Sequence, residues 1–295
     1  MVGTLLTYIA VTLRIISNPL GNVYQKQLTI KGHHPMLINF LTYLLLSLTC
    51  IFILFTVTWK KLPGEFWIYS ILGGIVGALG NGFLVKALQQ GDLSILGPIN
   101  SYKSVVGIVV AIFLLGEIPN LLGLAGVAII IFGSYLVLDT TEEKFSWALL
   151  KNTGIQFRIW AMILTAIEAV FVKKVILASD ITTAFISWCV FGAILSFLLL
   201  GFYRLNLKTE ISKLKAGELG KYLLLIICIG TMQFTTNYVF ANMPVGYALS
   251  LFQLSTLVSV FFGYRFFKEK DIRKKLLGAA IMIAGSVMII LMKDR

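Results

Sequence analysis

Residues 117–134 read EIPNLLGLAGVAIIIFGS, and residues 269–286 read EKDIRKKLLGAAIMIAGS. The two stretches lie 152 positions apart, close to half of the 295-residue chain. Identities at that offset include a Glu, a Leu, two Gly, an Ala, an Ile and a Ser. Shared apolar residues carry little weight in an apolar chain, but a Glu followed at the same spacing by a Gly and then by a Gly-Ser step indicates an internal duplication.

The composition predicts a membrane protein. Residues of the AVILMFWYC set make up 58% of the chain and charged residues 13%, against roughly 45–50% and about 25% in soluble proteins. The mean hydropathy is +0.90, and these values exclude a soluble enzyme, a disordered tail and a fibrous repeat. The formal charge is +12, but the basic residues lie mostly between apolar runs. We therefore expect loops facing anionic lipid and no nucleic-acid partner.

Signatures of catalysis or of metal binding are missing from the sequence. Cys50, Cys189 and Cys228 lie within apolar runs and have no second thiol or histidine at metal-ligand spacing. The sequence contains no HExxH, GxSxG, P-loop or CxxC motif. We expect no enzyme, no cofactor and no disulfide framework, and transport driven by gradients of solute or ions.

Ten apolar runs are long enough to cross a bilayer core, which takes about 20 helical residues. They cover residues 3–25, 35–57, 66–88, 93–115, 118–138, 153–177, 181–203, 219–241, 246–267 and 273–292. The predicted fold is an all-α membrane protein with ten transmembrane helices in two five-helix repeats, residues 1–140 and 141–295. Because five is odd, the repeats must be inverted, with a solute site near the midplane between them.

The ends of the spans also resemble a known family. The fourth and ninth spans end in LLGE (114–117) and FFKEK (266–270), and each following span reads G-x(6)-G-S. This layout resembles the drug/metabolite transporter superfamily, specifically its EamA-like ten-helix members. The resemblance implies a metabolite carrier, commonly an exporter, whose central cavity opens alternately to either side. We expect a multi-pass protein of the bacterial inner membrane, for which a monomer is sufficient.

Charged residues within the spans are candidates for a solute site, because a charge at a helix centre costs about 2.5–3.5 kcal/mol on insertion. At 1.5 Å per residue, Arg14 and Lys103 lie about 15 Å into their spans, and Glu168, the deep acid, about 22 Å. Arg158 lies nearer to its helix start. Lys86 is close enough to a span end to reach the interface, and we expect it to do so.

Neutral polar and aromatic residues complete the candidate site. They are Asn18, Asn22, Asn81, Asn100, Tyr102, Gln233, Asn237, Tyr238 and Gln253. The pairs 18/22 and 233/237 are each four residues apart, so each shares one helical face, as in a stripe that lines a pore. Each residue could instead form a hydrogen bond between helices, worth about 0.6 kcal/mol.

Proline and glycine predict two further features. Pro19 and the Gly97-Pro98 pair interrupt their spans and predict kinks that free backbone carbonyls. Gly73 and Gly77 form a GxxxG motif, which is typical of close helix packing.

The excess of positive charge within the spans predicts the solute. A solute with a carboxylate or phosphate would be attracted by this positive charge. The ammonium of a zwitterionic amino acid could pair with Glu168 as well. A different function that fits the same residues is proton-coupled export of cationic or amphipathic compounds, with Glu168 as coupling site and Lys103 as its resting partner. A non-transporting scaffold and an intramembrane enzyme are also compatible with the composition.

Two arguments give opposite orientations of the chain. Ten spans place 15 basic residues on one side and 6 on the side of the termini. The positive-inside rule then puts the termini outside the cytoplasm, whereas the family resemblance implies the reverse.

Overall fold

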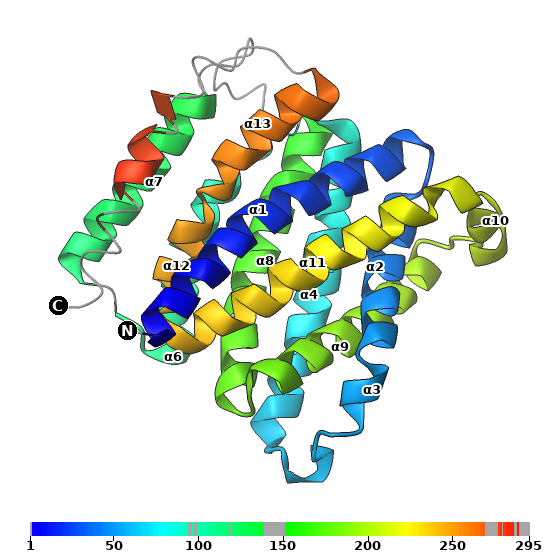
Figure 1. The fold of residues 1–295 in the computed structure, drawn as a ribbon, viewed down its shortest axis with the longest axis horizontal. Coiled ribbons are helices and arrows are strands. Elements are labelled where there is room, and N and C mark those ends of the chain that lie inside the picture. The colour runs from blue at the N-terminus through cyan, green and yellow to red at the C-terminus, as the bar shows by residue number, and fades with distance from the viewer. Residues whose placement is uncertain are drawn as a thin grey trace.

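The computed structural model describes residues 2–91, 93, 96, 99–118, 120–138, 151–268, 277, 278, 280–285 and 288. Every regular element in these ranges is helical, which confirms the all-α class. The helices pack side by side, and α1 (Val2–Ile30) lies between α11 (Leu219–Asn242) and α13 (Ser255–Phe267) (Figure 1).

The remaining helices fall into two series along the chain. In the first half they are α2 (Pro35–Thr49), α3 (Ile51–Leu54), η1 (Trp59–Lys61), α4 (Gly64–Gln90), η2 (Asn100–Tyr102), α6 (Lys103–Leu115) and α7 (Leu121–Leu138). In the second half they are α8 (Thr153–Leu177), α9 (Ile181–Phe202), α10 (Leu207–Ser212), η4 (Ala216–Glu218) and α12 (Val245–Phe252), besides α11 and α13. Further helical residues are 93, 96, 99, 277, 278, 280–285 and 288.

Four helices in the described part of the chain are long and apolar enough to cross a membrane. They cover Gly64–Gln90, Ile181–Phe202, Leu219–Asn242 and Val245–Phe267. Shorter apolar helices cover Pro35–Thr49, Lys103–Leu115 and Leu121–Gly133. Much of the predicted span 273–292 lies outside the described residues. The count of ten spans and the inversion of the two halves therefore stay predictions.

The first helix is longer than its predicted span, 3–25. It continues through Pro19 and ends at Ile30, shortly before Gly32. Gly32 has a φ of 91°, in the left-handed region that glycine adopts without strain, so the chain can turn here into α2. The second predicted interruption, Gly97-Pro98, lies outside the described residues.

The predicted spans 93–115 and 246–267 are interrupted at matching places. In the first, α6 begins at Lys103, directly after the 3₁₀ turn η2. In the second, α12 ends at Phe252 and α13 begins at Ser255. Lys103 and Ser255 are 152 positions apart, which is the offset of the sequence repeat. Discontinuous helices at corresponding places in two halves are characteristic of the solute sites of secondary transporters.

Four glycines of the sequence repeat meet where α7 packs on the last helical segment. A Cβ atom added to Gly133 would lie 2.6 Å from the carbonyl oxygen of Gly278. A Cβ atom added to Gly285 would lie 2.6 Å from the carbonyl oxygen of Gly126. The contact is therefore reciprocal, since each repeat supplies the same two glycines, and an exchange of this kind is what a two-fold relation produces. Glu269, the partner of Glu117 in the repeat, lies outside the described residues.

The loops at the end of the bundle where α1 terminates are joined by a buried carboxylate. His33 Nε2 lies 2.6 Å from Glu218 Oε2, and the His33 ring meets Tyr222 edge-on. Lys31 pairs with Glu218 Oε1 at 3.2 Å, and the backbone N–H of Lys215 donates to Glu218 Oε2 at 3.3 Å. This His33–Glu218 contact connects the loop before α2 with the turn before α11.

Candidate functional site

A cavity lies between helices of both halves of the chain, with about 660 Å³ of free space when the part open to solvent is included. Its four charged residues are the predicted Arg14, Lys103, Arg158 and Glu168. Its predicted neutral residues are Asn18, Asn22, Asn81, Asn100 and Gln233. Nine of the thirteen candidates therefore meet in this cavity. They come from helices α1, α4, α6, α8 and α11 and from the 3₁₀ turn η2.

Arg14 of α1 is held by groups of the second half. Its Nε donates to Thr236 Oγ1 at 2.8 Å, and its guanidinium lies 4.8 Å from the centroid of the Phe252 ring. Its Nη1 is buried and has no hydrogen-bond partner among the described residues. Because buried donors are nearly always paired in native structures, this nitrogen is suited to bind water or a solute.

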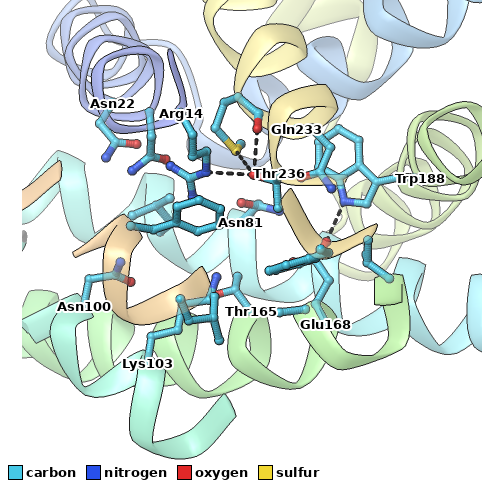
Figure 2. Close-up of a pocket in the computed structure, with 18 of the residues that line it drawn as sticks. Arg14, Asn22, Asn81, Asn100, Lys103, Thr165, Glu168, Trp188, Gln233 and Thr236 are labelled. Atoms are coloured by element: carbon cyan, nitrogen blue, oxygen red, sulfur yellow. Dashed lines mark hydrogen bonds between the residues drawn. The ribbon is translucent and has the colours of Figure 1, made fainter. Parts of the chain in front are cut away.

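Lys103 is the first residue of α6, directly after the break in its span. It lines the same cavity as Glu168, but no ion pair within 4.0 Å joins the two side chains in the described part of the chain. Figure 2 shows Arg14 and Lys103 entering the cavity from opposite sides. The space between them is therefore flanked by two cations.

Glu168 of α8 is bound by an aromatic residue that was not among the candidates. Trp188 of α9 donates its indole Nε1–H to Glu168 Oε1 at 2.7 Å (Figure 2). The Trp188 ring packs on Tyr43 with a centroid distance of 4.6 Å. Asn81 in turn donates to the Tyr43 hydroxyl at 2.6 Å. These contacts fix the carboxylate on one wall of the cavity while leaving it able to meet a solute.

Arg158 enters the cavity from α8, one turn or so after the helix begins. Its Nε donates to the carbonyl oxygen of Leu96 at 2.8 Å, and its side chain is buried. Lys86, by contrast, does not line the cavity. Its ammonium lies over the rings of Phe157 and Tyr203, at 5.0 and 4.3 Å from their centroids. Its position at the membrane interface stays a prediction.

Four of the predicted candidates do not line the cavity: Tyr102, Asn237, Tyr238 and Gln253. The side-chain amides of Gln233 and Asn237 hydrogen-bond to each other at 2.9 Å. Gln253 accepts a hydrogen bond from Asn100 at 3.4 Å and donates to Leu249 O at 2.8 Å. Asn237 therefore bonds to a neighbour within α11, whereas Gln253 also bonds to Asn100 of η2 in the other half of the chain, the role between helices that is the alternative to lining a pore.

The cavity also contains residues that no sequence pattern singles out. They are Leu84, Thr165, Ala169, Val172, Met232, Thr236, Phe240, Leu249 and Phe252, besides Trp188. Most are apolar or lie on helices whose facing side cannot be assigned without the packing. The described residues contain no group of three His, Cys, Asp or Glu that could hold a metal ion.

Comparison with known proteins identifies the family. The model of the EamA-like transporter family matches residues 5–139 and 152–291. A solved crystal structure of another protein is 16% identical, with a TM-score of 0.74 over 99% of this chain and 98% of that one, a likeness that shows the fold alone. No curated protein matches the chain significantly. Because the two family matches span nearly all of the sequence, the predicted resemblance is confirmed, and the chain belongs to the EamA-like transporter family of the drug/metabolite transporter superfamily.

Proposed function

We propose that the chain is a secondary-active transporter, an exporter or exchanger, of a small metabolite that carries a carboxylate or phosphate. Solute would bind between two inverted repeats, residues 1–140 and 141–295, and reach either side of the membrane by alternating access. The observation that carries the proposal is the gathering of Arg14, Lys103, Arg158 and Glu168 in one cavity. A charge buried within a membrane protein is costly unless it meets a polar partner, such as a bound solute.

The charge balance of the cavity supports an anionic or zwitterionic solute. Three cations face one carboxylate, and the low dielectric of a membrane interior strengthens their attraction for an anion. Among the described residues, Arg14 Nη1 has no hydrogen-bond partner, and Lys103 forms no direct ion pair with Glu168. Glu168 lies on another wall with Trp188, where it could take the ammonium of an amino acid. An amino acid is therefore the solute that we place first.

A second candidate function is the proton-coupled export of cationic or amphipathic compounds. It is favoured by the aromatic neighbour of Glu168, since Trp188 lies beside the carboxylate, lines the cavity and could receive an organic cation. Glu168 would then exchange a proton for the cation. A membrane scaffold that transports nothing, by comparison, would make no use of the polar groups that line the cavity.

The test is solute counterflow in liposomes that contain the purified protein. Labelled amino acids, organic acids, sugar phosphates and quaternary amines would each be offered, and each class would compete with the others. We expect saturable counterflow that is inhibited by anionic or zwitterionic solutes. Inhibition by quaternary amines alone would favour the second candidate, and no counterflow with any class would favour a scaffold. We assign the protein to a bacterial inner membrane and expect a monomer to be sufficient.

A further inference from the structure

A second, smaller pocket, which we call the branch, adjoins the cavity near the end of the bundle at which α1 and α4 terminate. The branch shares Asn18, Asn22, Leu84, Asn100 and Arg158 with the cavity and adds Ser255 and Ser259. Its far end is lined by Leu88, Leu93 and Leu96, whose exposed fractions are 1%, 1% and 2%. The branch is therefore an inner pocket with polar walls and an apolar end.

Two helices supply the polar walls. Asn18 and Asn22 are four residues apart on α1, and Ser255 and Ser259 are four apart on α13, so each pair shares a helical face. The two helices pack against each other, and Asn22, Ser255 and Ser259 are 6%, 4% and 4% exposed. The branch thus presents amide and hydroxyl groups that are shielded from bulk water, beside the buried guanidinium of Arg158.

One of these groups lacks a partner. Asn22 Oδ1 is buried and accepts no hydrogen bond from the described residues. Figure 2 shows Asn22 beside Arg14, with Asn100 across the cavity and nearer to Lys103. Among the described residues, Asn100 Nδ2 has only a 3.4 Å contact to Gln253 Oε1. Buried acceptors in native proteins are almost always satisfied. A donor from water or from a bound solute would complete this site.

The repeat itself does not require a polar branch. At the 152-residue offset Asn100 corresponds to Phe252, and Ser259 corresponds to Gly107. Phe252 is 2% exposed, and the space beside Gly107 is taken by Leu249. The positions related to Asn100 and Ser259 by the repeat thus hold apolar packing, whereas those related to Asn22 and Ser255 are Lys174 and Lys103. At Asn100 and Ser259 the polar groups of the branch are an asymmetric feature, as expected of groups that serve a solute rather than the fold.

We propose that the branch is a second subsite, which binds an uncharged hydrogen-bonding end of the solute while Arg14 and Lys103 hold its charged head. This inference rests on the proposed function, because it assumes a charged solute in the main cavity. A hydroxyl or carboxamide can donate to Asn22 Oδ1 and accept from a serine hydroxyl. A methyl group of the same size would leave both unpaired. The preferred solutes therefore carry a hydroxyl or carboxamide remote from the charge.

The test uses pairs of solutes that differ only by hydroxyl against methyl. The pairs are L-homoserine and L-norvaline, 4-hydroxybutyrate and pentanoate, and 2-hydroxyethyl phosphate and propyl phosphate. Each solute is tested as a competitor in liposome counterflow. The three pairs cover an amino acid, a carboxylate and a phosphate, so whichever of these classes binds is represented. The hydroxyl member of the pair should inhibit at about fivefold to tenfold lower concentration, the worth of one hydrogen bond.

Variants assign that preference to the branch. Ser259→Ala and Asn22→Leu should bring the hydroxyl-to-methyl ratio close to one while the methyl member still competes. Ser250→Ala is the matched control, because the Ser250 hydroxyl is buried but donates to Gly246 O at 2.9 Å within α12, outside the branch. It should keep the ratio of the unmodified protein. If Ser259→Ala or Asn22→Leu does not fold, as judged by thermal unfolding in detergent, Ser255→Ala is measured in its place.

Three results would overturn the inference. If the hydroxyl and methyl members of a pair compete equally for the unmodified protein, the branch does not select the uncharged end of the solute. An equal loss for both members in Ser259→Ala would assign Ser259 to the fold or to the solute path. If no charged class competes at all, the proposed function fails and this inference falls with it, a result distinct from binding without tail preference.

Discussion

Gly77 of α4 faces the carboxylate of Glu168 so closely that a methyl group at residue 77 would overlap Glu168 Oε1. The GxxxG motif of α4 does place this helix closely against α8, as its spacing predicts. Its second glycine also has a consequence for the site, because it leaves the room that the Glu168 side chain occupies beside Trp188.

The first prediction concerns this contact. Gly77→Ala should displace the Glu168 carboxylate and lower counterflow by about tenfold or more, since overpacking costs about 1–3 kcal/mol. Gly73→Ala is the matched control one turn away, because a Cβ atom there would meet Phe171 Cβ at an ordinary 3.6 Å. It should transport normally. Equal rates for the two variants would contradict the role that we give to Gly77.

The second prediction concerns proton coupling. Glu168→Gln keeps the size and the hydrogen-bond acceptor for Trp188 but removes the group that can gain and lose a proton. Counterflow measured from pH 5 to pH 8 should therefore lose its pH dependence. For a solute without an ammonium, the concentration for half-maximal transport should change by less than about threefold, whereas an amino acid, whose ammonium Glu168 would take, should also bind more weakly. A variant that keeps the pH profile of the unmodified protein would remove Glu168 from the coupling step.

The third prediction concerns the loop contact of Glu218. Burial opposes ionisation of this carboxylate, but the hydrogen bonds from His33 and Lys31 outweigh it and lower the pKa of Glu218 to about 2. A depressed pKa stabilises the folded state above the unfolded-state pKa, about 4.3, and this contribution is lost as the pH falls toward 2. Glu218→Gln should lower the Tm by about 2–4 °C at pH 6.

The difference in Tm between the unmodified protein and Glu218→Gln should shrink between pH 4.5 and pH 2.5. Glu65→Gln is the control, because Glu65 is exposed in the first turn of α4. It should follow the unmodified protein throughout. A Glu218→Gln curve that stays parallel to that of the unmodified protein down to pH 2.5 would contradict the assignment of the contact.

The sequence predicts all four charged residues of the cavity for a physical reason. A charge within an apolar span must meet polar surroundings, so Arg14, Lys103 and Glu168 can be predicted without knowledge of the packing. Trp188 offered no such signal, because an aromatic residue within an apolar run packs or lies at the interface by default. Its role depends on the rotation of α9 against α8, which only the packed structure gives.

Helical spacing has a similar limit. Four-residue spacing places Gln233 and Asn237 on one face of α11, but it does not say whether that face meets a cavity or a neighbouring side chain. In the structure Gln233 lines the cavity, and Asn237 bonds to Gln233. The sequence likewise does not predict the helix break before Ser255, because no proline or glycine stands near it. In the other half, Gly97-Pro98 predicts an interruption of the corresponding span.

The fourth prediction concerns orientation and follows the loop charges. A fluorescent protein fused to the C-terminus should stay dark and an alkaline phosphatase fusion should be active, because the 15-to-6 distribution of basic residues puts the termini outside the cytoplasm. The family resemblance implies the reverse. Bright cells with inactive phosphatase would show that the charge rule fails for this chain.

The last prediction is that Lys103 is the principal residue for binding an anion. Its counterpart at the 152-residue offset is Ser255, which begins α13 as Lys103 begins α6. The repeated scaffold therefore does not require the charge. A charge-assisted hydrogen bond contributes about 1.5–3 kcal/mol, so Lys103→Ala should weaken binding of an anionic solute by roughly 10-fold to 100-fold.

Lys103→Ala should remain folded and inserted in the membrane, because removing a buried charge removes its desolvation cost. Lys86→Ala is the control, since Lys86 lies on Phe157 and Tyr203 away from the cavity, and it should transport as the unmodified protein does. Both variants would be compared by counterflow and by thermal unfolding in detergent. If Lys103→Ala transports normally, the anion is held elsewhere, and Arg14, with its unpaired Nη1, becomes the residue to replace next.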